Sequence, residues 1–305
     1  MIQIQNISFS YAKNKKALDG VSFDVQKNKT VGLLGPNGGG KSTLFKIISS
    51  LLRKYEGEIF VDGLNQRKNL SEILPKMGVV FQSPSLDKKL TVEENLVYQA
   101  QLYGLSSKDI HTRIPALLET LDISDRKDDL VEHLSGGLAR RVEIVKSLLH
   151  FPSLLLLDEP STGLDIHARM ELWKFLKKIR LSQNLTILLT THFVEEANQC
   201  DEIVLINEGK IVAQGNPAEL KKSLTFKSFQ IKPKDLISAQ SILSQKFKII
   251  PDQENGFLQF KANPNQTKDI ANELATEVEE LMYRDPTLED VFIHYTGRGV
   301  TGVQR

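Results

Sequence analysis

The residues best suited to chemistry form a glycine-rich segment, Gly35-Pro36-Asn37-Gly38-Gly39-Gly40-Lys41-Ser42. This segment follows the β-prone run Thr30–Leu34 and precedes a helical pattern over 42–52. Glycines let successive backbone N–H groups converge on phosphate oxygens, and the following helix N-terminus adds its dipole. The lysine of such a segment reaches the β- and γ-phosphates, and the serine holds Mg²⁺. The sequence therefore predicts a nucleoside triphosphate site here.

Two carboxylates and a histidine follow later apolar runs. Ser153–Leu157 predicts a parallel strand buried on both faces, and Asp158 and Glu159 stand at its end. Ligands of open α/β sheets bind at the carboxyl ends of strands. Asp158 suits the Mg²⁺ shell, and Glu159 suits a base that orients or deprotonates water. His192 follows the next predicted strand, Leu185–Thr190, and on its own suits a structural role as well as a chemical one.

Two further features have open interpretations. Tyr11 lies upstream of the phosphate segment, where its ring either stacks on a purine or is half-buried at a strand end. Leu134-Ser135-Gly136-Gly137-Leu138 opens a helix that contains Arg140 and Arg141. A Ser-Gly-Gly at a helix start has anion-binding geometry, but Ser-Gly pairs also occur in many turns.

Composition limits the class of protein. A chain of 305 residues predicts two domains, and 40% hydrophobic with 25% charged residues is ordinary for a globular protein. The net charge of +1 gives no electrostatic reason to expect a nucleic-acid partner. The single cysteine, Cys200, excludes an internal disulfide. Because there is neither a signal-peptide pattern nor an apolar run near the ~18 residues of a membrane span, we expect a cytosolic protein.

The first predicted domain covers residues 1–222. Its patterns predict strands within 1–34, at Gly57–Asp62, Gly78–Phe81, Ile203–Ile206 and Lys210–Ala213. Residues 83–150 form a mostly helical insertion between strands. Its first helix opens with a capping box at Thr91 and continues to about Leu102. The second is Ile110–Leu121, with a kink or restart at Pro115, and the third follows Leu134–Leu138. Beyond the insertion we expect a helix at Ile166–Leu181, and Pro217–Lys222 closes the domain.

The second predicted domain, residues 223–296, is a small α+β unit. Its predicted elements are the strands Phe226–Ile231, Phe247–Ile250 and Phe257–Phe260, the helices Asp235–Gln245 and Thr267–Leu274, and a final short helix opened at Thr287. Residues 297–305 have no apolar period and predict a flexible tail.

Taken together, six motifs resemble those of the ATP-binding cassette (ABC) ATPases. In sequence and spacing they resemble the Walker A, Q-loop, signature, Walker B, D-loop and H-loop motifs, which are here Gly35–Ser42, Gln82, Leu134–Gly137, Leu154–Glu159, Ser161–Asp165 and His192. The resemblance covers about residues 1–222. It implies an α/β P-loop NTPase fold with a RecA-like core, an N-terminal antiparallel β-subdomain and a helical subdomain, followed here by the α+β domain.

The resemblance also implies ATP and Mg²⁺ as cofactors. Tyr11 would stack on adenine, and Ser42, Gln82 and Asp158 would attend Mg²⁺. The phosphates would be bound by the segment that consists of Gly35, Pro36, Asn37, Gly38, Gly39, Gly40, Lys41, Ser42 and Thr43.

Catalytic roles follow in the same way. Gln82 would sense the γ-phosphate and couple to the partner, Glu159 would be the general base, and His192 would contact the γ-phosphate. The signature residues Ser135, Gly136 and Gly137 would touch the nucleotide of a second cassette in a head-to-tail dimer, most simply a homodimer, with Asp165 at the seam. Leu138 stands where glutamine is common, so we expect weaker dimer contacts.

The segment Pro286–Phe292 resembles the C-terminus of ABC-2-type exporter ATPases. The expected function is therefore ATP hydrolysis that powers export through separate membrane-spanning permease subunits, with this chain at the cytoplasmic face of the membrane. The alternatives are import, a soluble ABC ATPase acting on DNA or ribosomes, and a regulatory module that no longer hydrolyses ATP. Glu159 and His192 count against the last of these.

Overall fold

The computed structural model describes residues 1–12, 15–120, 122–297 and 299, and it divides them into two compact units. The first unit comprises Met1–Asn216, and the second begins at Pro217. This division precedes residue 222 because α8 (Pro217–Lys222) packs against α11 (Leu288–Thr296) of the second unit. In the described part of the chain, no helix is both long and apolar enough for a membrane span.

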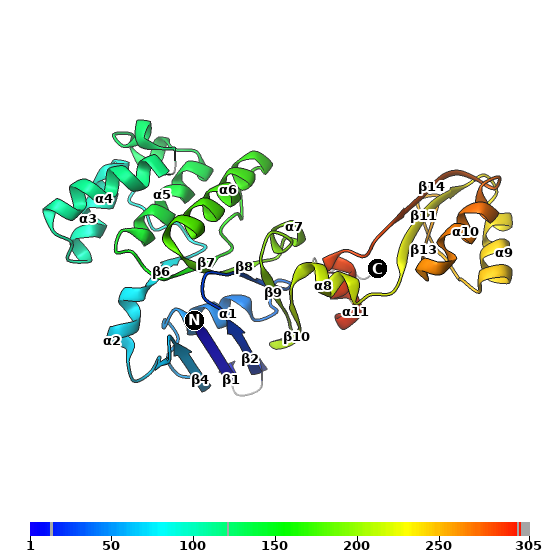
Figure 1. Cartoon of the computed structure of the whole chain (residues 1–305), viewed down its shortest axis with the longest axis horizontal. Coiled ribbons are helices and arrows are strands. Elements are labelled where there is room, and N and C mark those ends of the chain that lie inside the picture. Colours follow the sequence, from blue (N-terminus) through cyan, green and yellow to red (C-terminus); the bar gives the residue numbers. More distant parts are fainter. Residues whose placement is uncertain (13–14, 121, 298, 300–305) are drawn as a thin grey trace. The chain divides into compact units, whose positions relative to one another are not determined.

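Two sheets build the first unit (Figure 1). The antiparallel sheet has the order β2-β1-β4-β5 and consists of β1 (Ile2–Ala12), β2 (Lys15–Val25), β4 (Glu56–Val61) and β5 (Leu64–Asn65). The larger sheet has the order β10-β9-β3-β8-β7-β6 and consists of β3 (Thr30–Leu34), β6 (Met77–Val80), β7 (Leu154–Asp158), β8 (Thr186–Thr191), β9 (Glu202–Asn207) and β10 (Lys210–Gly215). Only β10 runs antiparallel to its neighbour. This architecture confirms the expected P-loop fold.

Helix α1 (Lys41–Ile48) lies between the two sheets and carries the phosphate segment at its start. Leu44 and Ile48 are buried in a core that also holds Ile4 and Val204, from one strand of each sheet. The helix is shorter than the predicted 42–52, because the backbone turns into the left-handed region at Ser50, φ 65°, and the buried Gln66 amide donates to the freed carbonyls of Ile47 and Ile48. The core therefore fixes the helix that positions the loop.

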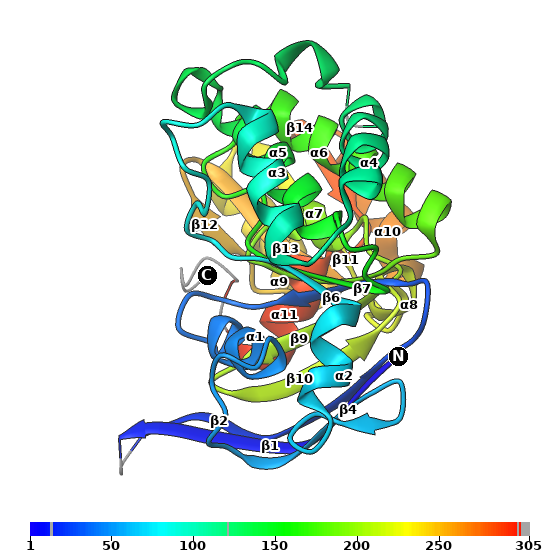
Figure 2. The same ribbon diagram turned by 90° about the vertical axis from the view of Figure 1, so that its left-hand side faces the viewer.

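The other large helices of the first unit lie on the opposite side of its six-stranded sheet from α1 (Figures 1 and 2). They are α3 (Val92–Leu102), α4 (Ser107–Thr120), α5 (Gly136–Leu148) and α6 (Ile166–Gln183), while α2 (Leu70–Ile73) and α7 (Val194–Ala197) are single turns. The capping box at Thr91 is confirmed. Pro115 lies inside α4, which does not restart there. Leu121, the predicted last residue of that helix, lies outside the described residues.

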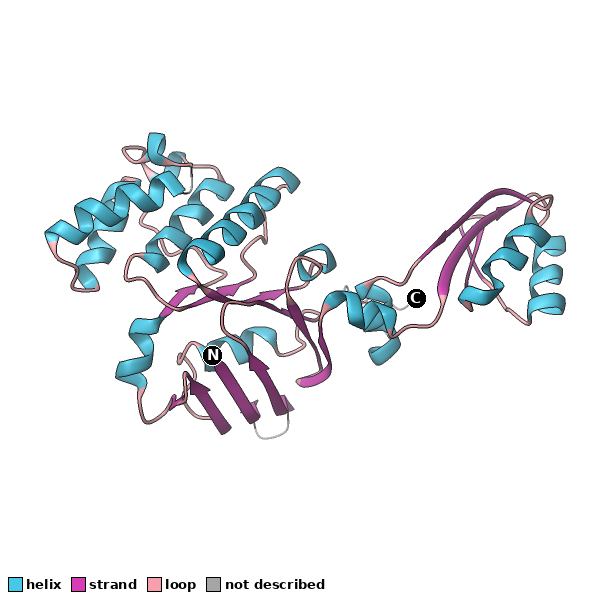
Figure 3. Cartoon of the chain, viewed as in Figure 1, coloured by secondary structure: helices cyan, strands magenta, loops and turns pink. Residues whose placement is uncertain are grey.

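Besides α8 and α11, the second unit contains a four-stranded antiparallel sheet with two helices over one face (Figure 3). Its strand order is β12-β13-β11-β14, with β11 (Lys227–Pro233), β12 (Asp252–Glu254), β13 (Phe257–Ala262) and β14 (Val278–Arg284). The helices are α9 (Leu236–Phe247) and α10 (Thr267–Leu274). Phe229 and Leu258 of the sheet are buried against Leu243 and Ile270 of the helices, which makes this unit's core.

Two predictions for this unit fail. The strand expected at Phe247–Ile250 is wrong, because α9 continues to Phe247 and ends at Lys248 in a left-handed conformation, φ 58°. Strands β12 and β14 were not predicted, because β12 is wholly polar and Glu279 and Glu280 break the apolar alternation of β14. Of the predicted tail at 297–305, only Gly297 and Gly299 are among the described residues.

Asp290 secures the start of α11, and its loss is expected to destabilise the second unit. Thr287 Oγ1 accepts from the Asp290 N–H, and the Asp290 carboxylate accepts from the Thr287 N–H and from Arg284. Burial acts to raise the pKa of Asp290, but these hydrogen bonds outweigh it and hold the pKa below its usual value. We expect Asp290→Ala to lower the free energy of unfolding at pH 7 by about 1–2 kcal/mol.

The measurement is urea denaturation across pH. A lowered folded-state pKa means that the carboxylate stabilises the fold above its unfolded pKa of about 4, and that this contribution disappears as the pH falls through the folded value. The free energies of unfolding of Asp290→Ala and wild type should therefore approach each other below about pH 4. Glu289→Ala is the matched control in the same helical turn. An equal loss in both variants would contradict the assignment.

Candidate active site

The predicted catalytic residues follow the carboxyl ends of adjacent parallel strands. β3, β8, β7 and β6 are neighbours in that order, and they are followed by Gly35, His192, Glu159 and Gln82 respectively. All residues of β3, β7 and β8 are buried, which explains their nearly continuous apolar sequence. Segments far apart in the chain thus meet at one edge of the sheet.

Two positions of the phosphate loop show why it needs glycine. Gly40 has φ 107°, and a Cβ there would come 2.9 Å from the carbonyl oxygen of Ala17. At Gly35 a Cβ would collide with the carbonyl oxygen of Ile206. Lys41, the first residue of α1, turns its Nζ back into the loop and donates to the carbonyls of Gly35 at 2.9 Å and Pro36 at 3.1 Å. Burial lowers the pKa of this ammonium, and Glu159 opposes that effect.

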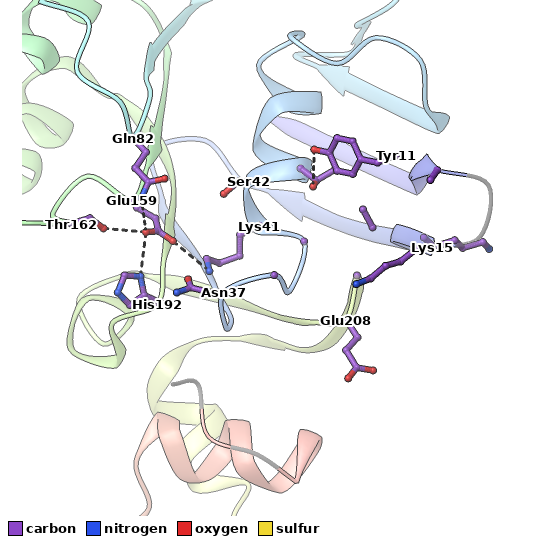
Figure 4. A pocket seen from close by; sticks show the side chains of 17 residues that line it. Tyr11, Lys15, Asn37, Lys41, Ser42, Gln82, Glu159, Thr162, His192 and Glu208 are labelled. Atoms are coloured by element: carbon purple, nitrogen blue, oxygen red, sulfur yellow. Dashed lines mark hydrogen bonds and ion pairs between the residues drawn. The ribbon is translucent and has the colours of Figure 1, made fainter. Parts of the chain in front are cut away.

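The Glu159 carboxylate is contacted by side chains from several segments of the site (Figure 4). Its Oε2 accepts from Thr162 Oγ1 at 3.1 Å and Gln82 Nε2 at 3.4 Å, and lies 3.3 Å from His192 Nδ1. Its Oε1 lies 3.5 Å from Lys41 Nζ. The residue is 8% exposed and has φ 45°, an unusual conformation for a non-glycine residue that is often found at functional sites. The carboxylate is therefore held facing the phosphate loop.

Asp158 lies deeper than Glu159. It is 5% exposed, and its Oδ1 accepts from Thr190 Oγ1 at 2.6 Å. Burial raises the pKa of Asp158, and the hydrogen bond from Thr190 opposes this. Clusters of three or more His, Cys, Asp or Glu suited to a metal are absent from the described ranges. One carboxylate with the Ser42 hydroxyl nevertheless fits Mg²⁺, which is usually held by one or two carboxylates, waters and substrate phosphates.

A cavity of about 1120 Å³ opens in front of these groups. Its lining comprises most of the predicted nucleotide site, namely Tyr11, Asn37, Gly38, Gly40, Lys41, Ser42, Thr43, Gln82, Glu159 and His192, together with residues not predicted, among them Lys15, Thr162 and Glu208. Gly35, Pro36, Gly39 and Asp158 are not among the residues that line the cavity. Tyr11 is 64% exposed, and its hydroxyl lies 3.3 Å from Thr43 Oγ1. Its ring is available for stacking on a base.

The signature residues do not line this cavity. Ser135 caps α5 by accepting from the Leu138 N–H at 3.3 Å, and Ser135 and Gly136 are exposed. Gly137 is buried, and a Cβ there would come 2.8 Å from that of Ala168 in α6. The Ser-Gly-Gly segment therefore presents a helix N-terminus outside this chain's own nucleotide cavity. Asp165, predicted at the dimer seam, caps α6 through Ala168 N at 2.8 Å and is exposed.

Sequence reasoning missed the groups that hold these strand ends in place. Arg140 is buried in α5 and donates to backbone carbonyls of residues 81 and 158–160 and to the Glu143 carboxylate. An arginine and a glutamate three residues apart, within the apolar run of Val142, Ile144 and Val145, could have indicated such a buried pair.

Glu196 is a second missed residue. This fully buried carboxylate of α7 accepts from Ser161 Oγ and from Thr191 Oγ1 at 2.6 Å. It thereby joins the residues that follow β7 to the end of β8, next to His192. Its signal in the sequence was only its place four residues after His192, on a turn too short to give a helical period.

Comparisons with known proteins show what this chain is similar to. The sequence profile of a family described as ABC transporter matches residues 18–162. Nod factor export ATP-binding protein I of Sinorhizobium fredii (strain NBRC 101917 / NGR234) is 35% identical over 302 residues, which cover 97% of this chain and 86% of that protein. The protein of the same name from Ralstonia nicotianae (strain ATCC BAA-1114 / GMI1000) is 32% identical and covers 98% of this chain and 94% of its own length.

Solved structures with the same fold include cbiO1 from Clostridium perfringens, described as part of the ABC transporter complex cbiONQ. It is 26% identical with a TM-score of 0.68, covering 81% of this chain and 96% of that one. The ATP-binding cassette MJ0796, in a dimeric post-hydrolysis state bound to ADP and Pi, is 25% identical with a TM-score of 0.63, covering 71% of this chain and 98% of that one.

Proposed function

The chain belongs to the ABC transporter family, and we propose that within it the chain is the subunit that hydrolyses ATP to power export through separate membrane permeases. The observation that carries the proposal is the Glu159 carboxylate, which accepts from Gln82 and Thr162 and lies beside His192 and Lys41 at the cavity of about 1120 Å³. Similarity over 97% of the chain to a Nod factor export ATP-binding protein supports export over import. Residues 223–296 would be an accessory domain to the cassette.

Hydrolysis by this site would proceed in one displacement. The phosphate-loop amides and Lys41 bind the β- and γ-phosphates, and Tyr11 stacks on the base. Glu159 accepts a proton from water as the water oxygen bonds to the γ-phosphorus and the bond to the ADP oxygen breaks. His192 and Gln82 orient the water and the γ-phosphate. Bound Mg²⁺, held by Ser42, Gln82 and Asp158, would neutralise the phosphate charge.

The direct test of this function is phosphate release by the purified protein. The rate should saturate with ATP and fall to background when EDTA removes divalent cations, since the phosphates then lack their counter-ion. Residual turnover in EDTA equal to that in Mg²⁺ would contradict the assigned chemistry.

The exposed signature supports a composite site. Ser135 and Gly136 lie at an exposed helix N-terminus outside this chain's cavity, which suits a phosphate bound by another molecule. The proposal is therefore a head-to-tail homodimer in which each signature completes the partner's nucleotide site, with Asp165 near the seam. The dimeric state of the MJ0796 cassette is consistent with this arrangement.

Ser135→Arg is expected to abolish ATP-dependent dimerisation while single chains still bind nucleotide, because the added side chain blocks only the partner's γ-phosphate. Analytical ultracentrifugation with and without MgATP measures the first property, and titration with a fluorescent nucleotide measures the second. Ser182→Arg, at the far end of α6, is a control. Loss of nucleotide binding by the Ser135 variant would place the signature within its own chain's site.

The permease would bind beside the Q-loop. A groove of about 450 Å³ is lined there by residues that include Gln82, Leu86, Lys88, Glu132 and Leu134. Leu86 is half-buried in a loop, outside the helical core. A cytoplasmic helix of a permease could insert an apolar side chain against it. Bound in this way, the chain would reside at the cytoplasmic face of the membrane.

Leu86→Asp is expected to weaken recruitment to vesicles that carry the permease by about tenfold, because it places a charge in an apolar contact. Flotation of the protein with those vesicles measures recruitment, and the ATPase rate of the isolated variant reports on its fold. Leu181→Asp, which changes an exposed leucine at the end of α6, is the control. Recruitment equal to wild type would show that the permease does not contact Leu86.

A further inference from the structure

Arg140 joins three parts of the first unit at once. Its guanidinium donates to the carbonyl oxygens of Phe81 at 2.7 Å, Asp158 at 3.2 Å, Glu159 at 3.4 Å and Pro160 at 2.9 Å. The residue is 8% exposed, so these bonds form away from solvent. One side chain of α5 thus holds the backbone on both sides of the catalytic carboxylate and the residue that precedes Gln82.

Glu143 completes the arrangement. Its carboxylate pairs with Arg140 at 2.7 Å and accepts from the Ser85 N–H at 2.6 Å. Lys146, one turn further along α5, donates to the Ser85 carbonyl at 2.8 Å. The same face of α5 therefore binds the loop after Gln82 as well as the end of β7. The pair also leaves no uncompensated charge in the buried region, which would be costly.

Glu159 needs such support because of its backbone. Its φ of 45° is unfavourable for a side chain with a Cβ and persists only where the surroundings impose it. Hydrogen bonds to the carbonyls of Asp158, Glu159 and Pro160 act directly on the peptide units that set this conformation. The direction of the Glu159 carboxylate toward the cavity therefore depends on where α5 places the guanidinium.

We propose that Arg140 is a positioning residue for hydrolysis, which ties the signature helix to the general base of its own chain. Helix α5 begins at the Ser135 cap and carries Arg140 little more than one turn later. In the proposed dimer, a signature that engages the partner's γ-phosphate would thereby fix Glu159 and the Q-loop of the chain to which it belongs. The inference rests on the proposed function and adds a route between the two nucleotide sites.

The test uses two variants of the full chain. Arg140→Lys keeps the charge next to Glu143, but one ammonium cannot span the carbonyls from Phe81 to Pro160. The paired variant Arg140→Met/Glu143→Met replaces the ion pair by apolar side chains of similar volume, a change that is often neutral for folding. Both variants are expected to lower kcat about 10- to 100-fold, with KM for ATP within about threefold, because misplacing a catalytic group slows chemistry more than binding.

The matched control is Arg113→Met. Arg113 of α4 also donates to a backbone carbonyl, that of Leu149, but it does not reach the catalytic strand. Its kcat should stay within about twofold of wild type at an unchanged or lowered Tm. A wild-type kcat in both Arg140 variants would overturn the proposal, and so would an equal fall of kcat in the Arg113 control.

A mutant cycle separates positioning from a general structural effect. Introduced into a Glu159→Gln protein, the paired variant should change the residual rate less than about twofold, because its effect passes through the missing carboxylate. An undiminished 10- to 100-fold loss in that background would overturn the proposal. If Glu159→Gln by itself leaves ATP turnover intact, the proposed function fails. If Glu159→Gln slows turnover but the Arg140 variants do not, the positioning role of Arg140 alone fails.

Discussion

Glu159→Gln is expected to slow phosphate release about 10²- to 10⁴-fold, the usual contribution of a general base. The amide matches the carboxylate in shape but cannot take a proton from water, so the loss should fall on kcat. ATP affinity should stay within a few-fold, because Glu159 does not form the phosphate loop and the amide keeps the shape of the side chain that accepts from Gln82 and Thr162. Steady-state kinetics and nucleotide titration measure the two quantities separately.

The control for this variant is Glu195→Gln, which changes a glutamate of α7 that takes no part in the site. It should retain wild-type turnover. Turnover within about threefold of wild type in the Glu159 variant would remove that residue from the role of base. A parallel loss of ATP binding would instead show that the carboxylate acts by holding Lys41.

Lys41→Ala is expected to weaken ATP binding about 30- to 5,000-fold, which corresponds to the ~2–5 kcal/mol typical for losing one partner of a buried charge pair. Lys41 is 4% exposed, and its ammonium donates to the carbonyls of Gly35 and Pro36 and lies 3.5 Å from Glu159 Oε1. A phosphate would give this buried cation a second anionic partner besides Glu159. Isothermal titration in Mg²⁺ measures the affinity.

Lys46→Ala is the matched control, because Lys46 lies on the same helix and is exposed. It should bind ATP as wild type does. Equal affinities of the Lys41 variant and wild type would contradict the phosphate-binding assignment for the loop.

The sequence predicted those parts of the site in which one residue type is required at one spacing. The phosphate loop needs glycine where φ is positive or a Cβ would collide, as at Gly40 and Gly35. The buried strands show as apolar runs, and Glu159 and His192 directly follow them. A capping box likewise needs particular residue types three positions apart, so Thr91 and Thr287 correctly marked the starts of two helices.

Other parts depend on contacts between distant segments. Arg140 owes its role to the carbonyls of Phe81 and Pro160, and no local pattern encodes those partners. Strand β14 forms because Leu281 and its neighbours pair with β11, although Glu279 and Glu280 disfavour a strand. Phe247 has a β-prone sequence around it, but the packing of α9 on the second core outweighs that preference.

The proposal that two chains form each active site is tested most directly by the mass of the Glu159→Gln protein in solution, measured by light scattering during size-exclusion chromatography. With MgATP, slow hydrolysis should trap the nucleotide between two chains, and the mass should be that of a dimer. With ADP, or with Ser135→Arg added, it should be that of a single chain. A Glu159→Gln protein saturated with MgATP that remains a single chain would contradict the composite site.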